Sequence, residues 1–262
     1  MNKTKIDWCD YVWNPVWGCY RGCRYCYARK FARRFAKNIA QKEAKFWEEN
    51  EQVRRRYILK VQNPDYRIFH PEQKEIIEDF LESFSLVFLI SNFEKLFPKK
   101  SSKIFVNSMS DIRYWKRKWM EMVLERIKRN PQHTFLFLTK SPHTYGYYSF
   151  PRNCWLGVSF TGSFEEESRL TEFYYIKSVK SENLFFISLE PFLDYELFEG
   201  YLLEAEWVIA GAQTNPYRPP KKEWIEDLIN LTRKQKIKLF IKDNIYRAYP
   251  DLPILKEFPA QR

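Results

Sequence analysis

The chain has 262 residues, enough for one domain with a full hydrophobic core. Its apolar runs, such as 84–90 and 184–187, are far shorter than the roughly 20 residues of a transmembrane helix, and its polar N-terminus lacks the apolar core of a signal peptide. We therefore expect a cytosolic protein without membrane contact, whose five cysteines serve as ligands and not as disulfides.

The formal charge of +11 is concentrated in one region. Residues 21–60 contain 13 Lys and Arg against 4 Asp and Glu, so this stretch holds +9 and the rest of the chain only +2. Such a local concentration of cations favours an acidic partner, of which nucleic acid is the commonest.

The first predicted elements are a weak strand at 11–13 and a helix over 24–45, joined by a cysteine-rich loop. A long insertion over about 46–100 follows the helix. It contains an apolar, helix-like piece from 76 to 90 and shows no catalytic signature. We interpret the insertion as a helical elaboration on the rim of a single domain that spans 1–262.

Beyond residue 100, short apolar runs alternate with helical stretches. The expected strands are 103–108, 134–139, 154–159, 184–188, 207–210 and 238–241, and the expected helices are 115–130, 164–179, 194–204 and 220–235, the last opening on Pro219 and Pro220. The strands are almost continuously apolar, as expected of parallel strands covered on both faces. Repeated β-then-α order therefore predicts an α/β protein with a mostly parallel sheet, namely a partial (β/α)6-type TIM barrel.

Polar residues collect at the carboxyl ends of these strands. They are Asn107, Ser108, Ser110, Asp111, Thr139, Lys140, Ser159, Ser188, Glu190, Gln213, Lys242 and Asp243. In a β/α barrel the active site lies at that end, so the set favours one mouth lined by six strands. The alternative is that strand ends are polar simply because loops begin there.

Three cysteines, Cys19, Cys23 and Cys26, follow the first strand with C-x3-C-x2-C spacing. Three thiolates this close together can hold three irons of a four-iron cluster and leave the fourth iron without a protein ligand. Zinc is the alternative, although it usually takes four ligands from paired C-x2-C knuckles. Cys9 and Cys154 are candidates to complete such a site, but a small buried side chain is the commoner role.

The cysteine spacing, with the aromatic Tyr25 before the last thiol, resembles the radical S-adenosylmethionine (radical SAM) superfamily. The resemblance implies that Cys19, Cys23 and Cys26 bind a [4Fe-4S] cluster whose fourth iron is chelated by SAM. One electron, from a donor such as flavodoxin or ferredoxin, then cleaves SAM to methionine and a 5′-deoxyadenosyl radical that abstracts hydrogen from the substrate. Tyr25 matches the aromatic position beside the SAM adenine.

A closer resemblance, over most of the chain, is to a phage- and prophage-associated group of radical SAM-like proteins classed as a domain of unknown function. It is carried by the segments 13–16, 105–111, 138–140, 155–159, 188–191 and 207–211. The chain departs from that group in its long insertion and in having Gly-Ala-Gln at 211–213 where Gly-Gly-Glu is usual. Residues 107–111 occupy the place of the superfamily element that binds the SAM amino group.

The resemblances and the polar strand ends together give two groups of expected site residues. The expected SAM-binding residues are Tyr25, Ser108, Ser110, Asp111, Ser159 and Ser188. The candidates for contacting substrate are Arg113, Lys140, Glu190, Gln213 and Lys242.

The first predicted helix has a basic stripe, which bears on the substrate. At 100° per residue five cations fall within an arc of about 140°, and residues 27, 28, 31, 32, 35 and 39 form the apolar remainder. The cations are Arg29, Lys30, Arg33, Arg34 and Lys37. A solvated outer helix face explains much of this pattern, but such a face normally includes acidic residues as well.

Two further runs, 54–56 and 113–119, add basic and aromatic groups that suit phosphates and bases. We therefore predict a nucleic acid or nucleotide substrate. The alternatives are a radical SAM enzyme that acts on a peptide or small metabolite, and a non-enzymatic, metal-stabilised module that binds nucleic acid.

Overall fold

The computed structural model describes residues 1–198 and 203–260. The chain forms two compact units, one made of Met1–Lys3 with Tyr11–His133 and the other of Thr4–Asp10 with Thr134–Arg262. Each unit has its own strands and helices.

In the first unit, two small groups of strands frame the cysteine loop. β2 (Tyr11–Val12) pairs antiparallel with β1 (Asn2–Lys3) and parallel with β5 (Lys103–Phe105). β3 (Val16–Trp17) pairs antiparallel with β4 (Val87–Phe88). The segment 46–100 therefore supplies a strand to the stretch that leads into the cysteines.

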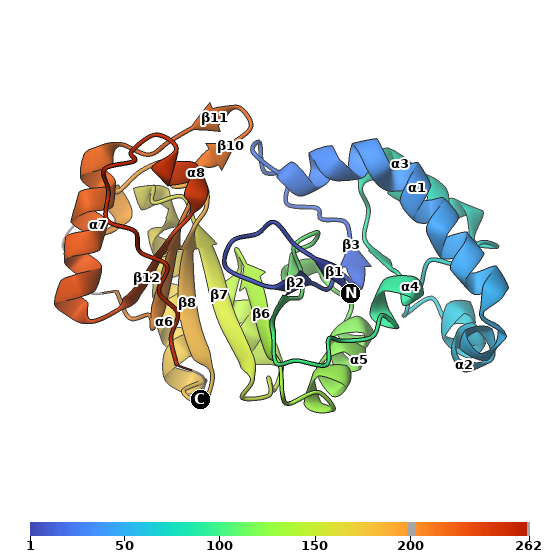
Figure 1. The fold of residues 1–262 in the computed structure, drawn as a ribbon. Helices are drawn as coiled ribbons and strands as arrows, with labels where there is room; N and C mark the ends of the chain where they lie inside the picture. Colours follow the sequence, from blue (N-terminus) through green and yellow to red (C-terminus); the bar gives the residue numbers. More distant parts are fainter. Residues whose placement is uncertain (199–202, 261–262) are drawn as a thin grey trace. The chain divides into compact units, whose positions relative to one another are not determined.

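The helices of the first unit include a 23-residue helix that starts at the cysteine loop. They are α1 (Tyr27–Glu49), α2 (Glu51–Gln62), α3 (Lys74–Ser83), α4 (Ile90–Phe93), the 3-10 turn η1 (Ile112–Tyr114) and α5 (Arg117–Lys128). Figure 1 shows α1 and α3 side by side. The buried face of α1 begins with Ala28, Ala32 and Ala36, which allow this close packing.

The prediction of one helical piece over 76–90 is wrong. α3 ends at Ser83, Phe84 takes a left-handed φ of 56°, and β4 follows. All residues from Phe84 to Phe93 are buried. In a run that is buried on all sides, the hydrophobic periodicity does not distinguish a strand from a helix.

The second unit contains a parallel sheet of five strands. Its neighbouring strands, in order, are β6 (Thr134–Thr139), β7 (Cys154–Phe160), β8 (Leu184–Leu189), β9 (Trp207–Ala210) and β12 (Lys238–Ile241). Every residue of β7 and β8 is buried, which agrees with their unbroken apolar sequences. The predicted α/β class and parallel sheet are confirmed, and closure into a partial barrel stays a prediction.

The remaining elements of the second unit connect these strands or follow them. They are η2 (Pro142–Tyr147), η3 (Phe164–Glu166), α6 (Glu167–Val179), η4 (Glu196–Phe198), the hairpin of β10 (Gln213–Thr214) and β11 (Tyr217–Arg218), α7 (Lys222–Gln235) and α8 (Asp243–Tyr246). In Figure 1, α7 lies against the edge of the sheet formed by β12.

The predicted helices differ from the observed ones in their bounds: α1 runs from 27 to 49 where 24–45 was expected, and α5 runs from 117 to 128 where 115–130 was expected. The helix expected over 194–204 is only the 3-10 turn η4 in the part that the structure describes, and 199–202 lie outside that part. α7 begins at Lys222, so Pro219 and Pro220 precede the helix and do not form its first turn. No helix within residues 1–198 and 203–260 has both the length and the apolarity needed to cross a membrane.

A buried carboxyl group connects α1 to the segment around α4. The Glu43 side chain is fully buried, and its carboxyl group accepts hydrogen bonds from Trp47 Nε1 (3.2 Å) and from the backbone N of Ser91 (3.1 and 3.2 Å). Burial raises the pKa of Glu43 to about 7, although these hydrogen bonds act in the opposite direction. The protonated form is therefore favoured in the folded protein at mildly acid pH.

We expect Glu43→Gln to remove a pH dependence of stability. Because folding raises the pKa, the contribution of Glu43 is fully present below its unfolded pKa of 4.5 and is lost as pH rises through 7. Relative to the variant, the wild type should therefore lose up to about 3 kcal/mol in its free energy of unfolding between pH 4.5 and 8. Urea unfolding across this range measures the difference, with exposed Glu48→Gln as the control. Parallel curves for wild type and Glu43→Gln would contradict the assignment.

Candidate functional site

The loop that carries the three cysteines is held by close backbone contacts. Gly18 has a φ of 101°, and a Cβ atom there would lie 2.1 Å from the carbonyl oxygen of Ser85. The backbone N of Cys19 donates to the carbonyl of Phe84 (3.1 Å), and the N of Gly18 donates to the carbonyl of Met109 (3.2 Å). Only glycine fits at position 18, because both its φ and its surroundings exclude a side chain.

The thiols of this loop lie at the start of α1. Cys26 is the N-cap, and its Sγ accepts a hydrogen bond from the backbone N of Arg29 (3.4 Å). The N of Cys26 donates to the carbonyl of Cys23 (3.1 Å), which closes a turn between these two cysteines. All three cysteines of the loop are half-buried and outside any disulfide. The positive end of the helix dipole favours anionic ligands at this place.

The surroundings of Cys19 disfavour its thiolate. Burial raises its pKa to about 11, partly offset by a backbone hydrogen bond at Arg21, and the charges of Asp111, Cys26 and Cys23 raise it further. Cys19 and Cys26 also pack against the apolar cluster that contains Trp17 and Ala28. Since metals bind thiolates, metal binding here would have to release the Cys19 proton.

The donor set of the loop fits an iron–sulfur cluster in its chemistry, because three thiols within eight residues are typical cluster ligands. Their present positions are not those of a bound metal. Within the part of the chain that the structure describes, no three Cys, His, Asp or Glu side chains are close enough together to hold a metal ion. Cys9 and Cys154 are buried, at 7% and 0% exposure.

The segment after β5 lies beside the cysteine loop. Gly18 and Ser110 form a parallel bridge, and Arg21 Nε lies 3.7 Å from Asp111 Oδ2. Asp111 also accepts from the backbone N of Arg113 (3.0 Å), and Ser110 Oγ accepts from Trp115 Nε1 (3.0 Å). The predicted residues Ser110 and Asp111 are thus brought to the cysteines, where part of their hydrogen-bonding capacity is used to shape the backbone.

Asn14 fixes this segment and was missed as a site residue. Its Nδ2 donates to Ser108 Oγ (2.9 Å), and its Oδ1 accepts from the backbone N of Met109 (3.2 Å). The carbonyl of Ser108 accepts from the hydroxyl of Tyr27 (2.6 Å). Tyr25 is half-buried within the loop. An Asn-Pro pair directly after a strand indicates a turn. It does not indicate the contact of Asn14 with Ser108 and Met109, which are distant in the sequence.

In the second unit, an ion pair lies at the carboxyl ends of β8 and β12. Lys242 Nζ is 2.6 Å from Glu190 Oε1, and both side chains are about 20% exposed. Glu190 Oε2 also accepts from Ser188 Oγ (3.2 Å) and from Trp8 Nε1 (3.2 Å). Burial is the largest single effect on the pKa of Lys242 and lowers it, but the charge and hydrogen bond of Glu190, together with Asp7 and Cys9, raise the pKa overall. Trp8 was missed because an indole N–H next to a carboxylate leaves no spacing signal in the sequence.

The other candidates of the second unit are less closely grouped. Lys140 Nζ donates to Ser159 Oγ (3.1 Å), so two neighbouring strand ends are joined. Gln213 lies in the β10–β11 hairpin, where its Nε2 donates locally to the carbonyl of Pro216 (3.0 Å). Of the six predicted residues in this unit, the structure thus brings together Ser188, Glu190 and Lys242 as one group and Lys140 and Ser159 as another. The single mouth lined by six strands stays a prediction.

In the basic and aromatic run 113–119, Arg113, Arg117 and Lys118 are exposed, but the two tryptophans are not. Trp115 and Trp119 are 6% and 1% exposed, and their indole N–H groups bond to Ser110 and to the carbonyl of Tyr66. Their faces are therefore not available to stack on bases. Trp119 lies on the buried face of α5 and Trp115 lies just before that helix, and the run of cations around them concealed their burial.

Exposed aromatic side chains occur instead at the cysteine loop and along α1. Tyr20, Tyr27 and Phe31 are 57%, 52% and 45% exposed, so Tyr27 and Phe31 do not belong to the buried face to which their periodicity assigned them. The ring of Tyr20 lies edge-on to that of Tyr114, with 5.7 Å between the ring centroids.

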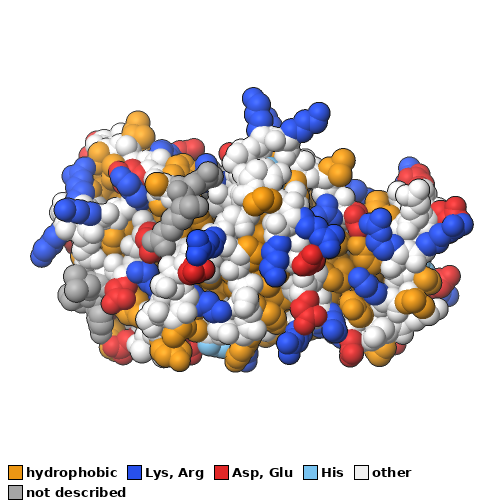
Figure 2. Space-filling model, turned by 90° about the horizontal axis from the view of Figure 1, so that it is seen from below, with side chains coloured by type: hydrophobic (Ala, Val, Ile, Leu, Met, Phe, Trp, Pro, Cys, Tyr) orange, Lys and Arg blue, Asp and Glu red, His pale blue; other side chains and the backbone are white. Residues whose placement is uncertain are grey.

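The basic stripe of α1 is largely exposed, as its periodicity predicts. Arg29 is the exception, because it is half-buried and its Nη2 donates to the carbonyl of Cys19 (3.1 Å). Arg33, Arg34 and Lys37 are exposed and have no carboxylate within ion-pair distance among the described residues. On the face drawn in Figure 2, by contrast, Lys and Arg side chains are interspersed with Asp and Glu.

A family model described as "Protein of unknown function (DUF5131)" matches residues 3–247. No curated protein and no solved structure matches the chain.

We expect the Glu190–Lys242 pair to stabilise the second unit as a coupled pair. Glu190→Gln should lower the free energy of unfolding by about 3 kcal/mol, because it leaves a largely buried ammonium group unpaired. Lys242→Met should cost a similar amount, and the double variant should cost clearly less than the sum. Urea unfolding of the four proteins gives the coupling energy. The exposed pair Arg152–Glu182 is the matched control, with an expected coupling much smaller than that of Glu190 and Lys242 because water screens it. Additive effects at 190 and 242 would contradict this.

Proposed function

For this chain, which belongs to the DUF5131 family of proteins of unknown function, we propose radical SAM chemistry with a [4Fe-4S] cluster held by Cys19, Cys23 and Cys26. The observation that carries the proposal is the placement of three thiols in one half-buried loop immediately before α1. When bound, such a cluster supplies the electron that cleaves SAM to methionine and a 5′-deoxyadenosyl radical.

The chain's own residues would order the surroundings of that loop. Gly18 allows its tight approach to the backbone of Ser85, and Asn14 holds Ser108 and Met109 in place beside it. Arg29 donates to the carbonyl of Cys19, which supports the first cysteine from the helix side. These contacts limit the movement of the thiols and shield one side of the loop from water.

For SAM itself we propose contacts from the segment 108–111 and from Tyr25. The carboxylate of Asp111 suits an ammonium group by its charge. Ser159 and Ser188 belong to the second unit, and their assignment to SAM rests on the resemblance alone. Ser188 is fully buried and donates to Glu190, which makes it the weakest member of the set.

We propose a nucleic acid or a nucleotide as the substrate. Phosphates would contact the unpaired cations Arg33, Arg34 and Lys37, and bases would stack on exposed rings such as Tyr20 and Phe31. Cations and aromatic faces are interleaved along the same helix, which is the combination that single-stranded nucleic acids require.

Anaerobic reconstitution with iron and sulfide tests the cluster. We expect about four irons per chain in the wild type and an EPR spectrum of the reduced protein that changes when SAM is added. Cys19→Ala, Cys23→Ala and Cys26→Ala should each lose the cluster, because only three protein ligands are available. Cys9→Ala and Cys154→Ala are matched controls that keep it. A zinc protein without iron, or a reduced cluster whose spectrum ignores SAM, would exclude radical SAM chemistry.

A salt titration of oligonucleotide binding tests the substrate class. Replacing Arg33, Arg34 and Lys37 together by Gln should weaken binding of single-stranded DNA or RNA and reduce the slope of log K against log salt by about 2, since each lost phosphate contact accounts for about 0.7. The control replaces Arg129, Arg152 and Lys238, exposed cations outside the predicted runs that are paired with Glu125, Glu182 and Glu257. Absence of binding at low salt, or equal effects of both triple variants, would reject a nucleic acid on α1.

A further inference from the structure

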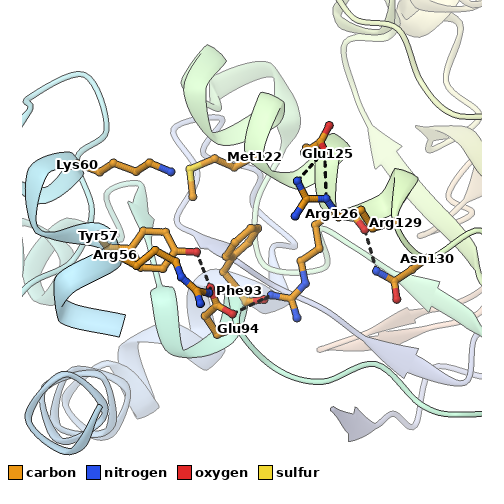
Figure 3. Close-up of a pocket in the computed structure, with 10 residues that line it drawn as sticks. All are labelled: Arg56, Tyr57, Lys60, Phe93, Glu94, Met122, Glu125, Arg126, Arg129 and Asn130. Atoms are coloured by element: carbon orange, nitrogen blue, oxygen red, sulfur yellow. Dashed lines mark hydrogen bonds and ion pairs between the residues drawn. The ribbon is translucent and has the colours of Figure 1, made fainter. Parts of the chain in front are cut away.

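A pocket in the first unit lies away from the cysteine loop in sequence, and the proposed function makes no use of it. It has a volume of about 500 Å³ and is formed by α2, the end of α4 and α5. This volume is within the range of sites for small organic ligands. Figure 3 shows its residues pointing toward one another from these three elements.

The charged residues of the pocket are unevenly balanced. Four cations line it against two carboxylates. Glu125 is occupied by Arg129, at 2.9 Å on the same helix. For the other three cations, Arg56, Lys60 and Arg126, the pocket lining thus offers one further carboxylate, that of Glu94.

Glu94 is fully engaged by its own partners. Its Oε1 accepts from the hydroxyl of Tyr57 (2.5 Å) and from Arg56 Nη1 (3.3 Å), and its Oε2 lies 3.6 Å from Arg126 Nη1. Arg126 is held further by bonds to the carbonyls of Phe93 and Lys95. The carboxylate thus serves to fix two guanidinium groups and a phenol at the pocket wall.

Lys60 is the cation left over. Among the described residues, no carboxylate lies within ion-pair distance of its ammonium, which is 5.2 Å from the ring of Tyr57 and 5.7 Å from the ring of Tyr66. In Figure 3 the ammonium group points toward Met122, into the space between α2 and α5. Burial and the neighbouring charge of Arg56 both lower the pKa of Lys60, so this amine is in an environment where an anion would be stabilising.

The pocket also has an apolar side. Phe93 and Met122 line it next to the charged groups, and Phe93 is 6% exposed. An excess of two positive charges beside an apolar wall matches a ligand that joins a dianionic group to a hydrocarbon or aromatic part.

We propose that this pocket binds a small organic phosphomonoester, with the phosphate between Lys60 and Arg56 and the organic part against Met122. A phosphomonoester carries close to two negative charges at neutral pH, which balances the excess of two positive charges in the pocket. The proposal is independent of the cysteine site and requires no metal.

Isothermal titration calorimetry of the full chain with phenyl phosphate tests the proposal. We expect measurable binding of phenyl phosphate, weaker binding of inorganic phosphate, which lacks the apolar part, and no binding of phenol, which lacks the charge. Lys60→Met should weaken phenyl phosphate binding at least about tenfold, because it removes the charge and keeps the apolar stem against Tyr57 and Tyr66.

Arg55→Gln is the matched control, since Arg55 is a neighbouring cation of α2 that is 78% exposed and paired with Glu51. Its affinity should equal that of the wild type, and a thermal melt of each variant shows that it is folded. The proposal is overturned if phenyl phosphate does not bind to folded wild type, if phenol binds as well as phenyl phosphate, or if Lys60→Met and Arg55→Gln have the same affinity. Cys26→Ala should leave this binding unchanged, so loss of the cluster and loss of the pocket are separate outcomes.

Discussion

The close approach between Gly18 and the backbone of Ser85 is the constraint on which the cysteine loop depends. Because Gly18 has no side chain, β3 and the segment before β4 can lie close together. The loop therefore leaves β3 at a fixed point. The backbone bond from Cys19 to Phe84 continues this contact. The insertion is therefore more than a rim: part of it forms the support beneath the thiols, and Glu43 holds the far end of α1 to the same segment.

In the second unit, an ion pair and two hydrogen bonds fix a group of polar side chains. Its five parallel strands have polar groups at their carboxyl ends. Two of the charged groups there, Glu190 and Lys242, form an ion pair. Ser188 and Trp8 satisfy the remaining oxygen of the carboxylate. The result is a polar group of residues that is mostly withdrawn from water, with two opposite charges in direct contact. Glu190 and Lys242 can meet because each directly follows a strand of the same sheet.

The sequence was most informative for the mostly buried parallel strands of the second unit. Strands 134–139, 207–210 and 238–241 were predicted to the residue, because parallel strands covered on both faces have unbroken apolar runs with clear ends. It failed where a long-range contact overrides a local pattern. The buried run 84–93 does not distinguish a helix from a strand, and Tyr27 is exposed because its hydroxyl bonds to Ser108. Asn14, Trp8 and the pocket around Lys60 depend on partners that are distant in sequence, which no spacing rule describes.

Gly211 has a consequence for how this chain can change over time. A Cβ atom at that position would lie 2.7 Å from Glu190 Oε1 and 2.8 Å from Lys242 Cδ. A methyl group at this position would require the side chains of Glu190 and Lys242 to move, so a change at position 211 acts first on the ion pair. The residue that a chain can accept at position 211 is therefore coupled to those at positions 190 and 242.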